Sequence, residues 1–302
     1  MTSATGVISG FREQKLLQRS FVLMLKAEGK SPTTVKRYEL SVGQFQEFAR
    51  AMGCPQMLTR EHVAHFLAQR LETKAGNTVR NDYMALVRFF RFLLEEGEIT
   101  SNPIEHIRAP KGDDHIPDPY SPEDVRKMLA AAKGRTCVEL RDAAIVWILL
   151  DTGLRASEFC RIGVSDVELD VERIKVVGKG RRERFVRIGL RAQRAVDRYL
   201  RVRTSARPEL WVNRVGGPLT ISGLFQIVER LCIKAGVQHP GIHRFRHTAA
   251  TMMRDLGIGD RDLMTLFGWS SFSMAARYTR SGERDRALRA HGLYSPADHL
   301  AN

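Results

Sequence analysis

Apolar residues in the first hundred positions recur at steps of three and four, which is the spacing of one face of an α-helix. One such series runs from Val35 to Met52, behind an N-cap serine and a proline at Ser31-Pro32. Further helices are expected over Phe11 to Glu28, from Thr59, and from about Thr78 to Gly97. No strand pattern interrupts them, so this region predicts a four-helix bundle.

The helical pattern then breaks. Asn102-Pro103 and the stretch from Ala109 to Pro119 bring prolines, a glycine and charges, which predict an extended linker. We place the domain boundary near residue 113. The expected organisation is a flexible N-terminus over 1–10, a helical domain over 11–107, a linker over 108–120, and a second domain over 121–302 with a C-terminal tail from about 282.

The second domain mixes two periodicities. Arg173 to Val177 and Arg184 to Ile188 alternate like strands around Gly178-Lys179-Gly180, which predicts a β-hairpin. The expected fold class is therefore mostly α with a small β-sheet, an α+β second domain after an all-helical first one. Helices are predicted at about 122–132, 139–151, 191–204, 222–235, 244–256, 260–267 and 272–280.

Charge narrows the class of partner. The formal net charge of +14 over 302 residues predicts a polyanion, with nucleic acid favoured over a membrane surface. No apolar run reaches the roughly 18 residues of a membrane span, and Met1 to Gly10 lacks the features of a signal peptide. The four cysteines are far apart and form no C-x-x-C pair, which indicates reduced thiols. We therefore expect a cytoplasmic, nucleoid-associated protein.

The positive charge is concentrated. Between Arg173 and Arg207 there are thirteen Lys or Arg residues against two acids, Glu183 and Asp197. A solvated helix face is the plain alternative. Because so many cations would repel one another without a counter-anion, we favour a surface that follows a nucleic-acid backbone.

A spaced set of phosphate-binding side chains gives the most specific signal. Each alone has an ordinary interpretation, such as an arginine paired with Glu158, a solvated lysine at a hairpin tip or a packed tyrosine. Together they are hard to explain by chance. Lys179 lies 24 residues after Arg155, His243 three residues before Arg246, Trp269 23 residues after Arg246, and Tyr278 nine residues after Trp269.

The order and spacing of these six residues resemble the tyrosine recombinase (phage integrase) family, and its Xer type in particular. The resemblance implies that Arg155 and Arg246 hold the scissile phosphate. It further implies that Lys179 protonates the leaving 5′ oxygen, that His243 contacts the phosphate and accepts a proton, and that Tyr278 is the nucleophile. Neither a metal nor a cofactor is implied.

Other positions are expected to support this chemistry. Trp269 stands where histidine is commonest in the family, and an indole cannot shuttle a proton, so phosphate contact and packing remain for it. Glu158 and His247 are expected as supporting residues. Basic residues expected to bind DNA are Lys36, Arg37, Arg80, Arg88, Lys175, Arg181, Arg182, Arg184 and Arg244, of which Lys175, Arg181 and Arg182 also stay open as substitutes for Lys179.

The resemblance also implies partners. The first domain would be the core-binding (SAM-like) DNA-binding domain, and the substrate would be double-stranded DNA with a short inverted-repeat core site. Strand exchange between two duplexes implies a homo-tetramer, or a hetero-tetramer with a paralogue. A type IB topoisomerase and an inactive DNA-binding regulator stay open as rivals. Integration, transposition, dimer resolution and inversion are not distinguished, nor is a docked C-terminal tail from a frayed one.

Overall fold

The computed structural model describes residues 11–53, 59–112, 118–178, 182–269 and 271–279, and single stretches at 287–288, 291–293, 295, 297 and 300. The chain divides into two compact units, Met1–His115 and Ile116–Asn302. Each unit has its own hydrophobic core.

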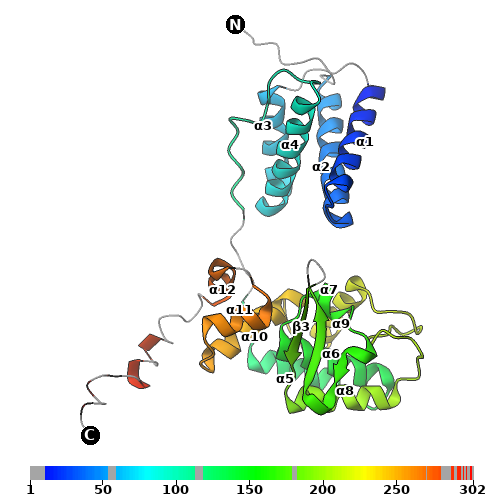
Figure 1. The fold of residues 1–302 in the computed structure, drawn as a ribbon, viewed down its shortest axis with the longest axis vertical. Helices are drawn as coiled ribbons and strands as arrows, with labels where there is room; N and C mark the ends of the chain where they lie inside the picture. Colours follow the sequence, from blue (N-terminus) through cyan, green and yellow to red (C-terminus); the bar gives the residue numbers. More distant parts are fainter. Residues whose placement is uncertain are drawn as a thin grey trace. The chain divides into compact units, whose positions relative to one another are not determined.

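The first unit is a bundle of four helices (Figure 1), as the apolar spacing predicted. Ser31 caps the second helix by accepting a hydrogen bond from the Thr34 amide at 3.2 Å, and Pro32 occupies the first helical position. The helices are α1 (Phe11–Ala27), α2 (Pro32–Ala51), α3 (Arg60–Thr73) and α4 (Gly76–Glu95).

Aromatic rings fill the centre of this bundle. Phe45 of α2 packs edge-on against Phe66 of α3 at 5.4 Å and against Phe90 of α4 at 5.6 Å. Buried Asp82 of α4 accepts hydrogen bonds from Ser41 at 2.7 Å and Arg70 at 3.0 Å. Apolar packing and one satisfied carboxylate thus tie three helices together.

The second unit combines helices with a three-stranded antiparallel sheet in the order β1-β2-β3. The predicted hairpin is confirmed, with β2 (Arg173–Val177) as expected and β3 (Glu183–Arg187) starting one residue earlier. The strand β1 (Val167–Glu168) was not predicted, because two residues are too few to show alternation. It lies between the short 3-10 helices η1 (Val164–Asp166) and η2 (Leu169–Val171).

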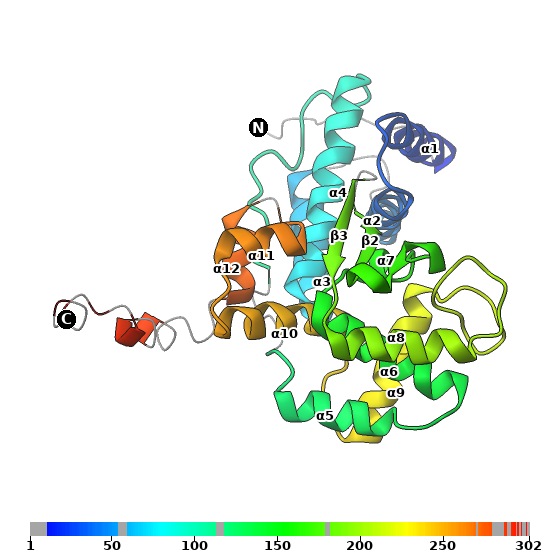
Figure 2. The same cartoon turned by 60° about the horizontal axis from the view of Figure 1, so that its bottom comes forward.

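The helices of this unit are α5 (Pro122–Ala131), α6 (Cys137–Thr152), α7 (Ala156–Phe159), α8 (Leu190–Val202), α9 (Ile221–Ala235), α10 (Ile242–Asp255), α11 (Asp260–Phe267) and α12 (Phe272–Thr279). The largely buried α6 packs against α5, α8 and α10. In Figure 2, α8 runs along α6, and α10, which also packs against α6, lies beside α11 and α12. None of the helices in the described part of the chain has both the length and the apolar character needed to cross a bilayer.

Two apolar clusters hold these elements. In the larger one, the Trp211 ring stacks on Phe159 at 4.7 Å and on Tyr199 at 5.7 Å. The smaller cluster joins α10, α11 and α12 and contains Phe267, Trp269 and Ala275, among other residues. Candidate site residues therefore lie at the junction of α6, α7 and this smaller group.

Candidate active site

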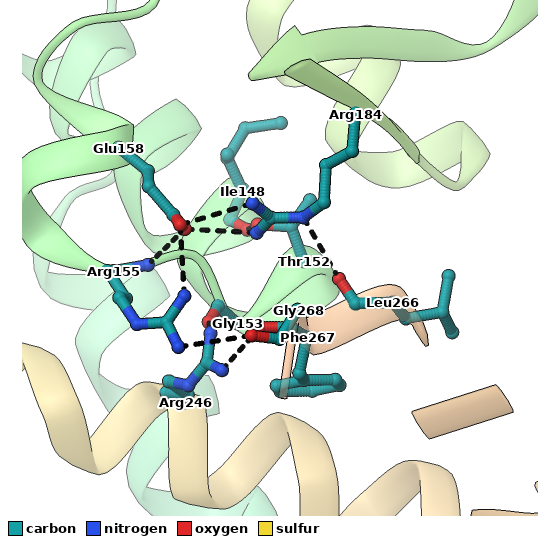
Figure 3. Close-up of polar contacts among 10 residues, drawn as sticks. All are labelled: Ile148, Thr152, Gly153, Arg155, Glu158, Arg184, Arg246, Leu266, Phe267 and Gly268. Carbon is teal, nitrogen blue, oxygen red and sulfur yellow. Dashed lines mark hydrogen bonds and ion pairs between the residues drawn. The ribbon is translucent and has the colours of Figure 1, made fainter. Parts of the chain in front are cut away.

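Arg155 stands at the start of α7, where the chain turns after α6. Its backbone amide donates to Glu158 Oε2 at 3.1 Å, and its Nη1 donates to Glu158 Oε1 at 3.0 Å (Figure 3). The Glu158 side chain is only 3% exposed, whereas that of Arg155 is 36% exposed. Helix geometry thus places a buried carboxylate directly behind an accessible guanidinium.

Arg184 reaches the same carboxylate from β3. Its Nη1 donates to Glu158 Oε1 at 3.1 Å, its Nη2 to Oε2 at 3.0 Å, and its Nε to the Leu266 carbonyl at 3.4 Å. Burial raises the pKa of Glu158, but the hydrogen bonds and charges of Arg184 and Arg155 outweigh it, so the pKa lies below its ordinary value. Glu158 is therefore ionised at neutral pH.

Arg246 of α10 is almost fully buried, with 1% exposed. Its Nη1 donates to the Gly153 carbonyl at 2.8 Å and its Nη2 to the Phe267 carbonyl at 2.6 Å. Arg155 Nη2 donates to the next carbonyl, that of Gly268, at 3.3 Å. The structure thus brings Arg155 and Arg246 together on successive carbonyls at the end of α11 (Figure 3).

Aromatic rings cover this junction. The Arg246 guanidinium lies 4.9 Å from the centre of the Phe267 ring and 5.2 Å from that of the Trp269 ring. Those two rings stack on each other at 4.8 Å. Trp269 is therefore the third predicted site residue at this place, and it belongs to the same apolar cluster as Ala275 of α12.

The close approach depends on glycine. Gly153 ends α6 with φ of 56°, and a Cβ there would lie 2.3 Å from Cε1 of Phe267. Gly268 ends α11 with φ of 60°. Any side chain at position 153 would push away the residue whose carbonyl holds Arg246.

The remaining predicted residues are placed less completely. His243 is exposed on the first turn of α10, three residues before Arg246, and His247 is buried on the same helix. Tyr278 belongs to α12, which packs against α10 and α11, but its side chain lies outside the described residues. Lys179 lies outside them as well, between β2 and β3. The roles of these four residues stay predictions.

Arg244 has contacts that the sequence pattern did not predict. Its Nε donates to the Asp118 carbonyl at 2.5 Å, its Nη1 to the Gln238 carbonyl at 2.6 Å, and it lies 4.2 Å from the Tyr120 ring centre. The Tyr120 amide donates to Thr248 Oγ1 at 2.8 Å. These bonds fasten the residues before α5 to the first turns of α10.

The other basic residues expected to bind DNA differ in their surroundings. Arg88 pairs with Glu28, and Lys175 lies 3.4 Å from a carboxylate oxygen of Asp166. Arg181 lies outside the described residues. The exposed members are Lys36, Arg37, Arg80 and Arg182. For the whole set, including Arg244, contact with DNA stays a prediction.

Sequence reasoning missed the pairing of Arg184 with Glu158. A signal was present, because Arg184 and Val186 are two residues apart on β3 and so share one face, and Val186 is buried. That alternation points Arg184 inward. The partner was not readable, since Glu158 is 26 positions away in the sequence.

Models of protein families match both units of the chain. Residues 120–284 match the model described as the phage integrase family, and residues 16–97 match the phage integrase N-terminal SAM-like domain. The tyrosine recombinase XerC of Pelobacter propionicus is 32% identical, over 92% of this chain and 94% of that relative. The tyrosine recombinase XerD of Listeria innocua is 29% identical, over 85% and 90% respectively.

Solved structures share the fold. The XerH site-specific recombinase bound to palindromic difH substrate, in a post-cleavage complex, superposes with a TM-score of 0.73 at 21% identity, covering 94% of this chain and 85% of that one. A lambda integrase tetramer bound to a Holliday junction gives a TM-score of 0.72 at 18% identity, covering 88% of this chain and 76% of that one.

Proposed function

The chain belongs to the phage integrase family of tyrosine recombinases, and from this premise we propose that Tyr278 is the nucleophile with which it cuts and rejoins DNA strands. The enzyme is thus a tyrosine-type site-specific recombinase of the Xer and integrase kind. The observation that supports the proposed site best is the meeting of Arg155, Arg246 and Trp269 at the end of α11.

The two arginines suit a phosphodiester substrate. Arg155 is partly exposed and anchored from behind, so it can bind phosphate oxygens without first becoming ordered. Arg155, Arg184 and Arg246 carry three positive charges against the single negative charge of Glu158. Such a preorganised positive region stabilises the added negative charge of a pentavalent phosphorus transition state.

The bond changes follow from these assignments. The Tyr278 oxygen attacks the scissile phosphorus and forms a phosphotyrosine bond, while the bond between phosphorus and the 5′ oxygen breaks. His243 would accept the tyrosine proton and Lys179 would protonate the leaving 5′ oxygen. A 5′ hydroxyl from another duplex then reverses the step, so the energy of the phosphodiester is conserved.

Strand exchange sets the expected partners. We expect double-stranded DNA with a short inverted-repeat core site, and a tetramer of this chain, or of this chain with a paralogue, on two duplexes. Among the relatives, the lambda integrase tetramer was solved on a Holliday junction, which is the DNA intermediate of such an exchange. A chromosomal substrate would place the enzyme in the cytoplasm with the nucleoid.

Trapping the covalent intermediate tests the nucleophile. Purified protein is mixed with nicked duplexes covering the DNA that flanks its own gene, then denatured and separated by electrophoresis. We expect a protein–DNA adduct from the wild type and none from Tyr278→Phe. Tyr199→Phe is the matched control, since it removes a buried hydroxyl of the same domain that donates to the Leu210 carbonyl.

The adduct assay also decides between the rivals. An adduct that persists in Tyr278→Phe would refute the assignment of the nucleophile. DNA binding by the wild type without any adduct would favour an inactive regulator. Relaxation of a supercoiled plasmid that lacks a recombination site would favour topoisomerase activity over strand exchange between two sites.

A further inference from the structure

We propose that Arg184 is a positioning residue of the recombination reaction, which neutralises Glu158 so that the charge of Arg155 remains available to the scissile phosphate. The inference rests on the proposed function and extends it to a residue outside the six. It gives Arg184 a task different from the DNA contact that its place in a basic segment predicted.

The contacts of Arg184 are those of an internal brace. Its guanidinium forms a two-bond fork with both oxygens of Glu158, at 3.1 and 3.0 Å, and its side chain is 19% exposed. Its Nε turns toward the Leu266 carbonyl, one residue before the carbonyl that binds Arg246. Arg184 therefore joins β3 to both α7 and the end of α11 (Figure 3).

The contact with Arg184 changes the net charge of the group that Arg155 and Glu158 form. Arg155 and Glu158 alone form a pair with no net charge, and a buried carboxylate would hold the guanidinium and compete with phosphate for it. With Arg184 the group of three carries a net positive charge. Glu158 can then orient Arg155 through its amide and Nη1 without cancelling the charge that the phosphate needs.

A similar arrangement elsewhere in the domain supplies a matched control. Asp142 of α6 is buried between Arg141, which donates to it at 2.7 Å, and Arg230 of α9, which also contacts it. Arg230→Met removes one arginine from a buried carboxylate, just as Arg184→Met does. It alters the net charge equally, and in the part of the chain that the structure describes neither Asp142 nor Arg230 bonds to Arg155, Arg184 or Arg246.

The first measurement is the rate of adduct formation under single-turnover conditions. We expect Arg184→Met to slow it about 100-fold, the scale on which loss of one transition-state charge contact acts, while Arg230→Met leaves it near the wild-type rate. Arg184→Lys keeps the charge without the fork and recovers part of the rate. Thermal melts of each variant establish that the compared proteins are folded.

A double variant separates charge from architecture. Glu158→Gln in the Arg184→Met protein removes the carboxylate that then neutralises Arg155, so the double variant should cleave about tenfold faster than Arg184→Met alone. A scissile methylphosphonate, which carries no charge, should also narrow the gap between Arg184→Met and the wild type. A purely structural brace would give a double variant at least as slow as the single one, and an equal gap on both substrates.

A measurement without DNA keeps the two proposals apart. Phenylglyoxal modifies accessible guanidinium groups, and its rate at Arg155 can be followed by mass spectrometry. Arg184→Met should slow modification of Arg155 about threefold, because a carboxylate no longer shared with Arg184 binds the Arg155 guanidinium more tightly. Glu158→Gln should restore the rate. Unchanged rates, or a double variant no faster than the single one, would overturn the role of Arg184. A wild type that never forms an adduct would count against the proposed function instead.

Discussion

Glu158 has an unusual place for an acidic residue in a protein that binds a polyanion. It lies directly behind Arg155, is almost fully buried, and accepts hydrogen bonds from the Arg155 amide and from two guanidinium groups. Burial alone would favour its neutral form, but the bonds and charges of Arg184 and Arg155 keep its pKa below the ordinary value. Its negative charge is therefore stabilised by folding.

This lowered pKa predicts a pH-dependent contribution to stability. A carboxyl group whose pKa is lower in the folded state stabilises the fold above its unfolded pKa of about 4.3 and ceases to do so as the pH falls through the folded pKa. We expect Glu158→Gln to reduce the free energy of unfolding by about 2 kcal/mol at pH 7, and by clearly less at pH 3. Urea unfolding at the two pH values measures the difference.

Glu123→Gln is the control for general effects of pH. Its carboxylate pairs with Arg126 at the surface of α5, with both side chains more than half exposed, so its loss should matter little at either pH. A penalty for Glu158→Gln that is equal at pH 7 and pH 3 would show that folding does not lower the pKa of this carboxyl group.

At the scale of residues, sequence spacing identified Arg155, Arg246 and Trp269, which the structure brings to one place. The spacing is informative because it is combined with residue type: only a few side chains can bind a phosphate or attack it, and a set of them at fixed intervals rarely arises by chance. Long-range pairing is different. Arg184 lies in a run of basic residues in which nothing marks it as the one that bonds Glu158, so only the folded structure, in which the two side chains meet, could reveal the pair.

At the scale of elements, the end of α6 decides how closely α6 and α11 approach each other. Gly153 adopts a left-handed conformation, and the space that a Cβ would take is filled by the Phe267 ring at 2.3 Å. The Gly153 and Phe267 carbonyls also hold the Arg246 guanidinium from two sides. One small residue therefore sets both a helix end and the position of a site arginine.

We expect Gly153→Ala to destabilise the fold by about 3 kcal/mol, from left-handed strain and from the clash with Phe267 together. Gly236→Ala is a matched control, since Gly236 ends α9 with φ of 66° and a Cβ there would meet no atom of the described residues within 4 Å. Strain alone should cost it about 1 kcal/mol. Chemical unfolding measures both, and equal penalties would mean that the contact with Phe267 is not maintained.

The order of helices and strands could largely be predicted from apolar spacing, because each element buries one continuous face. Ends were predicted less well where a cap was overlooked. The helix expected from 139 begins at Cys137, because Thr136 and Glu139 form a reciprocal capping box at its start. The strand β1 has only two residues, and they are a strand because they pair with Arg173 and Ile174. No local sequence pattern predicts such a pairing.

At the scale of the whole molecule, the two units have independent cores. The buried cluster of the first contains residues from Phe21 to Ile104, and those of the second contain residues from Tyr120 onward. The Tyr83 hydroxyl donates to the Ile107 carbonyl at 2.7 Å, so the chain beyond the bundle is still fastened to it. Each unit thus has the apolar core that independent folding requires.

We therefore expect fragments 1–112 and 118–302 each to unfold cooperatively. We also expect each fragment to bind the duplex that the enzyme cuts more weakly than the intact chain does. Linkage makes the second contact intramolecular, so the intact chain should bind about 100-fold more tightly than an equimolar mixture of the fragments at the same salt concentration. Fluorescence anisotropy measures these affinities. Because the basic residues are divided between the fragments, the affinity of the intact chain should also fall more steeply with added salt than that of either fragment. If one fragment alone matched the affinity and salt dependence of the intact chain, only that unit would contact DNA, and the other would have to act through assembly of subunits.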